Sequence, residues 1–207
     1  IFIKSNSLSL HMKILAFADP HSHEEYLDQI KLKSKNVDII ICAGDLTWFN
    51  KNIKKLLKKL NVLKKPVYII NGNHENTKEM AKLCKPLKNV SFMHKKTLRI
   101  DNNVFLFFGN DGLSPNEPQF YKFSKREMQK VKKTDTVVLV THGPASKTKL
   151  DLLPCGHVGC KDIKEFILKY KPVLHISGHL HEHFGKKQLL KKTLMVNVGP
   201  GGRILKV

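Results

Sequence analysis

The stretch Ile14-Leu15-Ala16-Phe17-Ala18-Asp19-Pro20-His21 joins an apolar run to a polar cluster, and this pairing decides the fold. The run has the composition of a buried strand, and the cluster begins where that strand would end. Further apolar runs lead in the same way into Gly44-Asp45, Gly72-Asn73-His74-Glu75, Thr141-His142-Gly143-Pro144 and Gly178-His179-Leu180-His181. Polar residues that follow several strands meet at one edge of an α/β sheet. The sequence therefore predicts an α/β fold with its site at that edge.

The polar clusters contain the residue types that bind metal ions. Together they hold two aspartates, one asparagine and five histidines. Carboxylates and imidazoles gathered at one point are typical metal ligands. A single cluster of this kind is equally well explained as an ordinary turn at the end of a strand, but the whole series is not. We therefore predict a metal centre.

Apolar periodicity predicts strands and helices that alternate in the first part of the chain. Strands are expected at residues 13–18, 37–42 and 67–70, and helices at 24–33, 53–63 and 77–84. Strands at 91–93, 97–100 and 104–108 form the middle. Strands at 136–140, 173–176, 188–190, 193–198 and 203–207 follow, with helices at 124–131, capped by Ser124 and Glu127, and at 161–170. The economical arrangement is two sheets face to face with helices on both outer sides.

The length of 207 residues suits one domain, which we place at residues 12–207. Met12-Lys13 resembles a natural start, so residues 1–11 are interpreted as an extension that need not be native. No apolar run approaches the roughly 18 residues of a membrane span, and we expect no membrane partner. The four cysteines are scattered, which favours a reducing, cytoplasmic location.

The chain carries a formal net charge of +20, which could attract anionic partners. The excess is almost entirely lysine, since Arg99, Arg126 and Arg203 are the three arginines. Proteins that read bases and phosphates usually use the planar fork of arginine. Lysines spread over every helix indicate a compositional bias more than a dedicated surface. A nucleic-acid partner therefore stays open but is not favoured.

The ordered motifs Asp-x-His, Gly-Asp, Gly-Asn-His-Glu, His-Gly-Pro and Gly-His-x-His resemble those of the calcineurin-like metallophosphoesterase superfamily, and they span residues 19–181. The stretches 141–144, 149–151, 156–159 and 172–182 are similar to the narrower Icc-related phosphoesterase group. The resemblance implies a four-layer α/β/β/α sandwich of two mixed β-sheets.

Carried over by residue, the resemblance implies two divalent metal ions. One would be held by Asp19, His21, Asp45 and His181, and the other by Asp45, Asn73, His142 and His179, with Asp45 as the bridge. His74 and Asp45 are the predicted catalytic residues. Ligands with nitrogen and oxygen but no thiolate suit Mn, Fe, Zn, Ni or Co, and manganese is favoured.

One position departs from the phosphatase branch of the superfamily. The aspartate that orients the catalytic histidine there stands three residues after the Gly-Asp aspartate, and here that position is Trp48. The partner of His74 is therefore not identified. Trp48, His23 and His157 are the predicted substrate contacts, each against a plain structural alternative: a packed aromatic for Trp48 and exposed loop residues for the histidines.

The function predicted first is a metal-dependent phosphodiesterase that hydrolyses a small phosphate ester, such as a nucleotide, by in-line attack of a hydroxide between the two metals. One alternative is a nuclease or RNA-processing enzyme with the same metals, which the net charge motivates. Another is a non-catalytic scaffold of the same fold, which the filled ligand positions argue against. The oligomeric state is left open.

Overall fold

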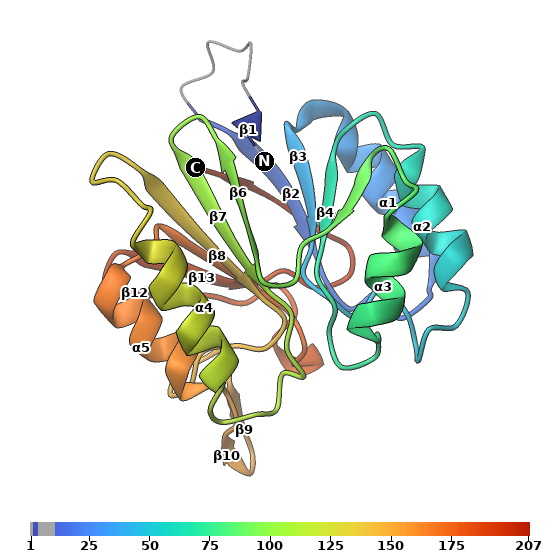
Figure 1. The fold of residues 1–207 in the computed structure, drawn as a ribbon. Coiled ribbons are helices and arrows are strands. Elements are labelled where there is room, and N and C mark those ends of the chain that lie inside the picture. The colour runs from blue at the N-terminus through green and yellow to red at the C-terminus, as the bar shows by residue number, and fades with distance from the viewer. Residues whose placement is uncertain (1, 4–10) are drawn as a thin grey trace.

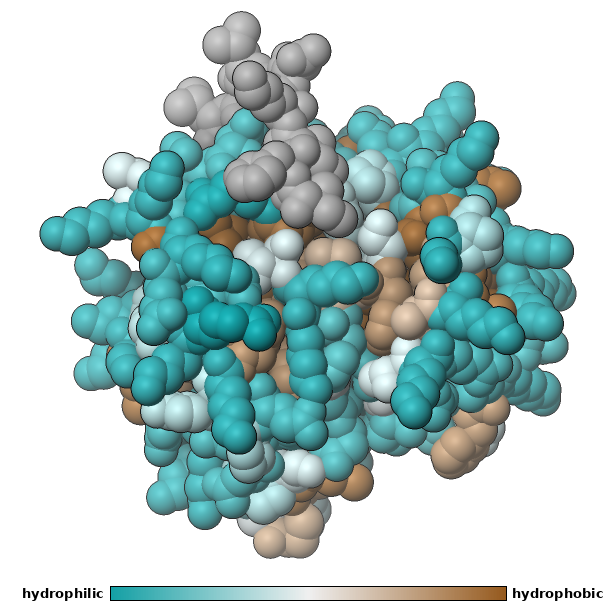
Figure 2. Space-filling model, in the orientation of Figure 1, coloured by the Kyte–Doolittle hydropathy of each residue, from teal (hydrophilic) through white to brown (hydrophobic). Residues whose placement is uncertain are grey.

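The computed structural model describes residues 2–3 and 11–207, which form four layers (Figure 1). A five-stranded sheet and a seven-stranded sheet lie face to face. Helices α1, α2 and α3 cover the outer side of the first sheet, and α4 and α5 cover the outer side of the second. The predicted α/β/β/α sandwich is confirmed. Figure 2 shows that hydrophilic side chains cover most of the same face.

The five-stranded sheet has the order β14 (Arg203–Lys206), β2 (Lys13–Phe17), β3 (Ile39–Cys42), β4 (Val67–Ile69) and β5 (Val90–Phe92). The strands β2 to β5 are parallel, and β14 is antiparallel to β2. The chain crosses between the parallel strands through α1 (Glu24–Lys33) with the short η1 (Ser34–Asn36), α2 (Ile53–Asn61) and α3 (Thr77–Cys84). These bounds follow the predicted alternation of strand and helix.

The seven-stranded sheet has the order β1 (Phe2–Ile3), β6 (Lys96–Ile100), β7 (Asn103–Phe108), β8 (Thr136–Thr141), β11 (Leu174–Ser177), β13 (Thr193–Asn197) and β12 (Lys187–Leu190). It is mixed, because β6 and β12 are antiparallel to their neighbours β7 and β13. The segment treated as an extension contributes β1, which pairs with β6. Its residues 1 and 4–10 lie outside the described part, and its interpretation as an extension stays a prediction.

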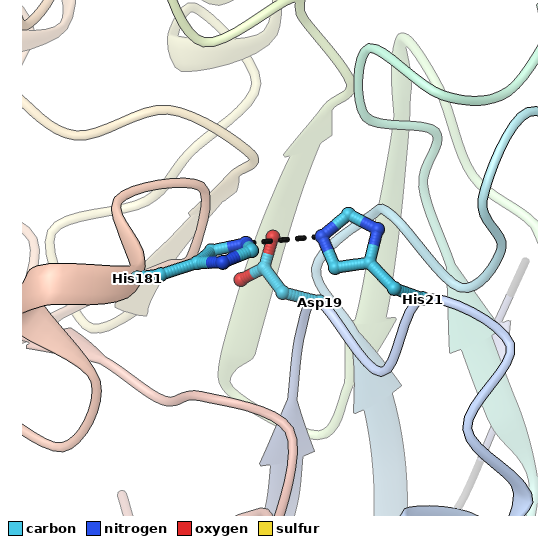
Figure 3. Close-up of side chains that lie close together, drawn as sticks. All are labelled: Asp19, His21 and His181. Atoms are coloured by element: carbon cyan, nitrogen blue, oxygen red, sulfur yellow. Dashed lines mark hydrogen bonds between the residues drawn. The ribbon is translucent and has the colours of Figure 1, made fainter.

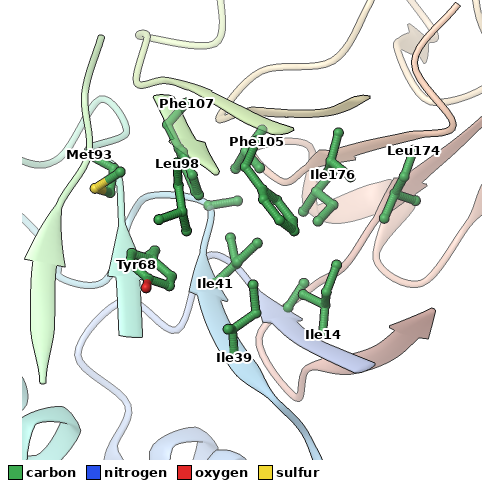
Figure 4. Packing of buried hydrophobic residues seen from close by; sticks show 14 of the residues in the cluster. Ile14, Ile39, Ile41, Tyr68, Met93, Leu98, Phe105, Phe107, Leu174 and Ile176 are labelled. Carbon is green, nitrogen blue, oxygen red and sulfur yellow. The ribbon is translucent and has the colours of Figure 1, made fainter. Parts of the chain in front are cut away.

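Alternation along the strands builds three apolar layers from two sheets. In β2, Ile14 and Ala16 face the seven-stranded sheet, whereas Leu15 and Phe17 face α1 and α2. Figure 4 shows the central layer, where Ile41 and Phe105 belong to opposite sheets. Both faces of the central strands are therefore buried, which explains why those strands read as continuous apolar runs.

The helix predicted at 124–131 is α4, and it spans Pro118–Met128. Pro118 occupies the first turn, where its fixed φ suits a helix start and its missing N–H costs nothing. The predicted cap is wrong: Ser124 lies inside the helix and donates to the Tyr121 carbonyl. Glu127 accepts instead from Arg126 and Lys130. A Ser-x-x-Glu spacing also occurs within helices, and the proline was the better signal.

Between β8 and α5, where the sequence analysis places no strand, the chain forms a small hairpin, β9 (Leu152–Leu153) and β10 (Gly156–His157). The helix α5 (Lys161–Tyr170) follows as predicted. A short helical turn, η2 (His181–His183), comes after β11. No helix in the described part of the chain is both long and apolar enough to cross a membrane.

Candidate metal centre

The predicted ligands lie on turns that follow strands of both sheets. Asp19 and His21 come after β2, Asp45 after β3, and Asn73 with His74 after β4. From the other sheet, His142 follows β8, and His179 and His181 follow β11. The two sheets face each other, so the turns at these strand ends meet between them. The seven predicted ligands come from segments far apart in the sequence, and His21 and His181, for example, are separated by 160 positions.

The first group of candidate ligands is Asp19, His21 and His181, whose ligand atoms all lie within 4.8 Å of one another. Figure 3 shows the two imidazoles on either side of the carboxylate. The Nε2 atoms of His21 and His181 are 3.0 Å apart. The Asp19 carboxylate also accepts from the backbone N–H of His179, which holds it in place. This group contains three of the four residues predicted for the first site, and Asp45 is the fourth.

The second group is Asp45, His142 and His179, again within 4.8 Å. His142 Nδ1 donates to the Ala43 carbonyl at 2.9 Å, which turns its Nε2 toward Asp45 Oδ2 at 3.3 Å. A hydrogen bond from the far ring nitrogen is the usual way to orient a metal-binding histidine. Asn73 Oδ1 is 3.2 Å from the same Nε2. The residues predicted for the second site therefore also come together.

Asp45 belongs to two of the groups, since it also lies with His21 and His74. Its Oδ2 is 3.8 Å from His21 Nε2 and 3.7 Å from His74 Nε2. Its other oxygen accepts from the His74 backbone N–H at 3.0 Å. A carboxylate in this central position has the placement that a bridging ligand needs.

Burial and charge set the protonation of the cluster. Desolvation lowers the pKa of His21 and of His179 to about 4 each, so both rings are neutral at pH 7 and keep a lone pair. Desolvation raises the pKa of Asp19 to about 7. Burial also disfavours charge on His142, but the Asp45 and Asp19 carboxylates outweigh it and raise its pKa to about 9. Buried carboxylates that demand a compensating positive charge are well suited to a cation.

The donor set therefore fits metal ions of the predicted class. Imidazole nitrogens, carboxylate oxygens and one amide oxygen converge, and none of the candidate groups in the described residues includes a cysteine. Such a set suits divalent first-row ions. The role of each residue as a ligand stays a prediction.

The backbone at the ligands is strained. Asp19, Asp45 and His179 have φ values of 60°, 50° and 68°, in the left-handed region that non-glycine residues avoid. Each such residue costs about 1–3 kcal/mol, and such strain is often found at functional sites. Gly72 is required for close approach, because a β-carbon there would lie 2.1 Å from Asp45 Oδ1. The turns are thus shaped around the carboxylates.

Glu75, which closes the Gly-Asn-His-Glu motif but received no predicted role, is a buried clamp. Its Oε2 accepts from the N–H groups of Asp45 and Gly72 at 3.1 and 3.0 Å. Its Oε1 accepts from the N–H and hydroxyl of Thr47 at 2.8 and 2.9 Å. One side chain therefore ties the turn that carries Asp45 to the turn that carries His74. The signal was its place in the motif, directly after predicted site residues.

Asn110, which received no predicted role, is also a positioning residue. Its buried Oδ1 accepts from the backbone N–H groups of His142 and Gly143, both at 3.0 Å. It thereby holds the turn after β8. The sequence carries a weak signal for this, because a buried asparagine in a Gly-Asn-Asp-Gly segment cannot be distinguished from a turn asparagine by pattern.

Trp48 and Phe49 both pack their aromatic rings against His74. The Trp48 ring stacks on His74 with centroids 4.5 Å apart and planes inclined by 24°. Phe49 meets the same imidazole edge to face at 4.3 Å. His74 Nδ1 is buried and makes no hydrogen bond within the described residues. An aromatic wall therefore stands where the related phosphatases are expected to have a carboxylate.

A cavity of about 610 Å³ opens beside the first group of ligands. Predicted contacts Trp48 and His23 both line it, together with Tyr26, Lys51 and Phe184. Trp48 is half exposed and His23 is more exposed, and the His23 imidazole Nδ1 is 3.1 Å from Glu25 Oε1.

His157 is not among the residues that line this cavity. It lies on the β9–β10 hairpin and bonds the buried Asp151 carboxylate at 2.9 Å. The structure therefore does not bring His157 together with the other predicted site residues, and its contact with substrate stays a prediction.

Comparison with known proteins gives a consistent result. Residues 12–183 match the family model described as calcineurin-like phosphoesterase. The chain is 25% identical to the uncharacterized protein MJ1162 of Methanocaldococcus jannaschii over 92% of its length and 89% of the relative. It is 28% identical to the UPF0046 protein K07C11.7 of Caenorhabditis elegans, over 84% of this chain and 65% of that protein.

Solved structures share the fold at low identity. The protein TT1561 of Thermus thermophilus aligns with a TM-score of 0.72 at 14% identity, over 92% of this chain and 90% of that one. The phosphopantetheinyl hydrolase of Mycobacterium tuberculosis aligns with a TM-score of 0.62 at 14% identity, over 91% and 89%. These likenesses concern the arrangement of helices and strands.

Proposed function

Because this chain belongs to the calcineurin-like phosphoesterase family, we propose that it is a metal-dependent phosphodiesterase that hydrolyses a small phosphate ester. The observation that carries the proposal is the convergence of two three-residue ligand groups, the first of which lines a cavity of about 610 Å³. The cavity has room for a small organic ester and is walled by aromatic and basic side chains.

Asp19, His21, Asp45 and His181 would hold one metal ion, and Asp45, Asn73, His142 and His179 would hold the second. Nitrogen and oxygen donors suit Mn, Fe, Zn, Ni or Co, and among these we favour manganese. Bound divalent ions would supply Lewis acidity toward the phosphoryl oxygens and a water activated for attack. Asn73 contributes a neutral oxygen, which limits the negative charge that faces an anionic ester.

His74 would act on the ester directly. Its Nε2 lies 3.7 Å from Asp45 Oδ2, its ring stacks on Trp48, and its backbone N–H donates to Asp45 Oδ1. A histidine held in this way can donate a hydrogen bond to a phosphoryl oxygen or to the leaving oxygen, which stabilises the charge that develops there. Trp48 also lines the cavity and would contact the organic part of the substrate.

A nuclease with the same metals is the alternative that the net charge of +20 favours. Long nucleic acid would give hydrolysis that falls steeply with salt, because many phosphate contacts release counterions. A small ester would give a shallow dependence. The scaffold alternative predicts near-zero metal content in protein purified without chelator.

A cytoplasmic location forms part of the proposal. All four cysteines are unpaired, and three of them are buried. Thiols that persist without pairing are typical of proteins kept in a reducing compartment.

The proposal is tested by a matrix of metals and substrates. Mn²⁺, Ni²⁺, Zn²⁺ and Mg²⁺ are each assayed with phosphomonoesters, aryl phosphodiesters, cyclic nucleotides and single-stranded RNA. We expect hydrolysis of aryl diesters or cyclic nucleotides with Mn²⁺, lost in Asp45→Asn but kept in the control Asp28→Asn, which changes an exposed carboxylate on α1. Absence of hydrolysis with every metal would refute the proposal, and preference for RNA would favour the nuclease.

A further inference from the structure

A second cavity lies next to the one beside the metal centre. It has a volume of about 380 Å³ and is formed by the segment 198–203 together with Lys33, Phe184 and Gly185. Phe184 and Pro200 line both cavities, so the two share a wall. The Phe184 ring also packs against His181, with centroids 4.7 Å apart. The Phe184 ring therefore lies between the second cavity and the candidate ligand His181.

The charge of this cavity is positive. Lys33 and Arg203 line it, and no aspartate or glutamate is among the described residues around it. Lys33 Nζ donates to the carbonyls of Gly201 and Gly202, which supports the glycine-rich loop with a full positive charge. Small residues and a cationic rim leave room for an anionic group to approach the backbone.

Arg203 differs from the other two arginines. Arg99 makes two hydrogen bonds to Asp135, and Arg126 bonds Glu127. Arg203 makes no ion pair or side-chain hydrogen bond with any described residue, and its guanidinium lies over Gly185, where a β-carbon would be 2.2 Å from Nη2. Arg203 is an exposed residue that lines the cavity without an ionic partner among the described residues. Its planar fork suits a phosphate or carboxylate.

The position of Arg203 is set by the sheet. Arg203 pairs with Ala16 of β2, three residues before Asp19. Asp19 lies beyond the end of β2, so strand spacings of about 3.3 Å per residue and about 5 Å between strands place the Cα atoms of Arg203 and Asp19 at most on the order of 10 Å apart. The scaffold thus fixes the Arg203 backbone close to the metal centre, at a distance comparable to the length of a sugar or a short alkyl chain.

We propose that the cavity around Arg203 is a second anion site, which binds a phosphate or carboxylate group carried by the substrate at the end opposite to the hydrolysed ester. This inference rests on the proposed function and deepens it. The substrate class becomes a phosphodiester with a second anionic group on the part that occupies the cavity lined by Trp48 and Phe184.

The test compares two p-nitrophenyl hexyl phosphodiesters on the metal-loaded protein. One has a hexyl chain that ends in a phosphonate, which cannot be hydrolysed, and the other has a chain that ends in a hydroxyl. We expect Arg203→Gln to raise KM for the phosphonate ester roughly ten- to hundredfold, as loss of a charge-assisted pair does. The KM for the hydroxyl ester and the kcat for both esters should not change. For the phosphonate ester, the KM of Arg203→Lys should lie between those of wild type and Arg203→Gln. The control Arg126→Gln has the same net charge as Arg203→Gln, and its KM should match that of wild type.

A readout independent of turnover is an NMR titration with hydroxyhexylphosphonate, the tail of that substrate, whose binding should weaken by the same factor in Arg203→Gln. Equal effects of Arg203→Gln and Arg126→Gln, or equal effects on the two esters, would overturn the site. If added sulfate changes hydrolysis of the hydroxyl ester in wild type but not in Arg203→Gln, the cavity takes a free anion and the substrate tail is refuted. Hydrolysis of both esters without preference for the phosphonate ester would refute only this inference, whereas no hydrolysis of either ester would refute the proposed function as well.

Discussion

Replacement of Glu75 by glutamine tests whether a buried carboxylate holds the metal centre together. The carboxylate accepts four hydrogen bonds, from Asp45 N, Gly72 N, and the N–H and hydroxyl of Thr47. Glutamine replaces one of the two oxygens by an NH₂ group, which cannot accept. If its oxygen serves Asp45 and Gly72, the Thr47 hydroxyl can rotate to accept from the NH₂ group, but the Thr47 N–H loses its partner.

The magnitude follows from this count. A buried donor without a partner costs about 1–3 kcal/mol, and hydrogen bonds to a charged acceptor contribute more than neutral ones. We expect Glu75→Gln to lower the free energy of unfolding by about 3 kcal/mol. For a chain of this size that lowers Tm by about 6–12 °C. If the glutamine oxygen accepts from Thr47 instead, the Asp45 N–H loses its partner. Metal affinity should then fall about 10- to 100-fold, as it does when residues that orient a metal ligand are changed.

The assay is thermal unfolding in chelator, which isolates the effect on the fold, followed by a metal titration of the same variant. Glu79→Gln is the matched control, because Glu79 is exposed and accepts one side-chain hydrogen bond, from Asn50. It should change the unfolding free energy by less than about 0.5 kcal/mol.

Burial raises the pKa of Glu75, so a protonated side chain is the competing state. A protonated carboxyl resembles glutamine, and the substitution would then be mild. A Tm within about 2 °C of wild type, with metal affinity unchanged, would therefore refute an ionised clamp.

Asp45→Asn should lower metal content and reduce ester hydrolysis by about two orders of magnitude or more, while Asp28→Asn leaves both intact; full metal content in Asp45→Asn would contradict its central role. Trp48→Ala should lower kcat about 3- to 10-fold with metals retained, because an aromatic pair contributes about 0.5–1.5 kcal/mol. Trp48→Phe should recover most of the lost activity. An unchanged kcat in Trp48→Ala would rule out that stacking on Trp48 positions His74. Burial lowers the pKa of His175 to about 3. At pH values near and below 6.5 the unfolded chain therefore binds more protons than the folded chain. Between pH 7 and pH 5, wild type should lose about 2 kcal/mol more unfolding free energy than His175→Gln, measured by urea unfolding. Parallel pH profiles of the two proteins would argue against a buried neutral ring.

The sequence was informative about strands and helices because the apolar pattern of each element depends on residues that are neighbours in the chain. Apolar runs followed by glycine and polar residues predicted every strand that carries a candidate ligand, to within about two residues. The helix α4 was misplaced because two local signals competed, and the proline at its start outweighed the Ser-x-x-Glu spacing. The resemblance to a family supplied the ligand residues, which no periodicity could have done.

What the sequence by itself determined is therefore the order of strands and helices, the layered fold and the identity of the residues at the strand ends. The tertiary structure alone decided which of them touch: His21 meets His181 across 160 residues, Trp48 stacks on His74, and Glu75 joins two turns. The same holds for the unpaired Arg203 beside Phe184. The physical reason is that a local pattern depends on neighbours in the chain, whereas a site depends on distances that exist only after two sheets have packed on one core.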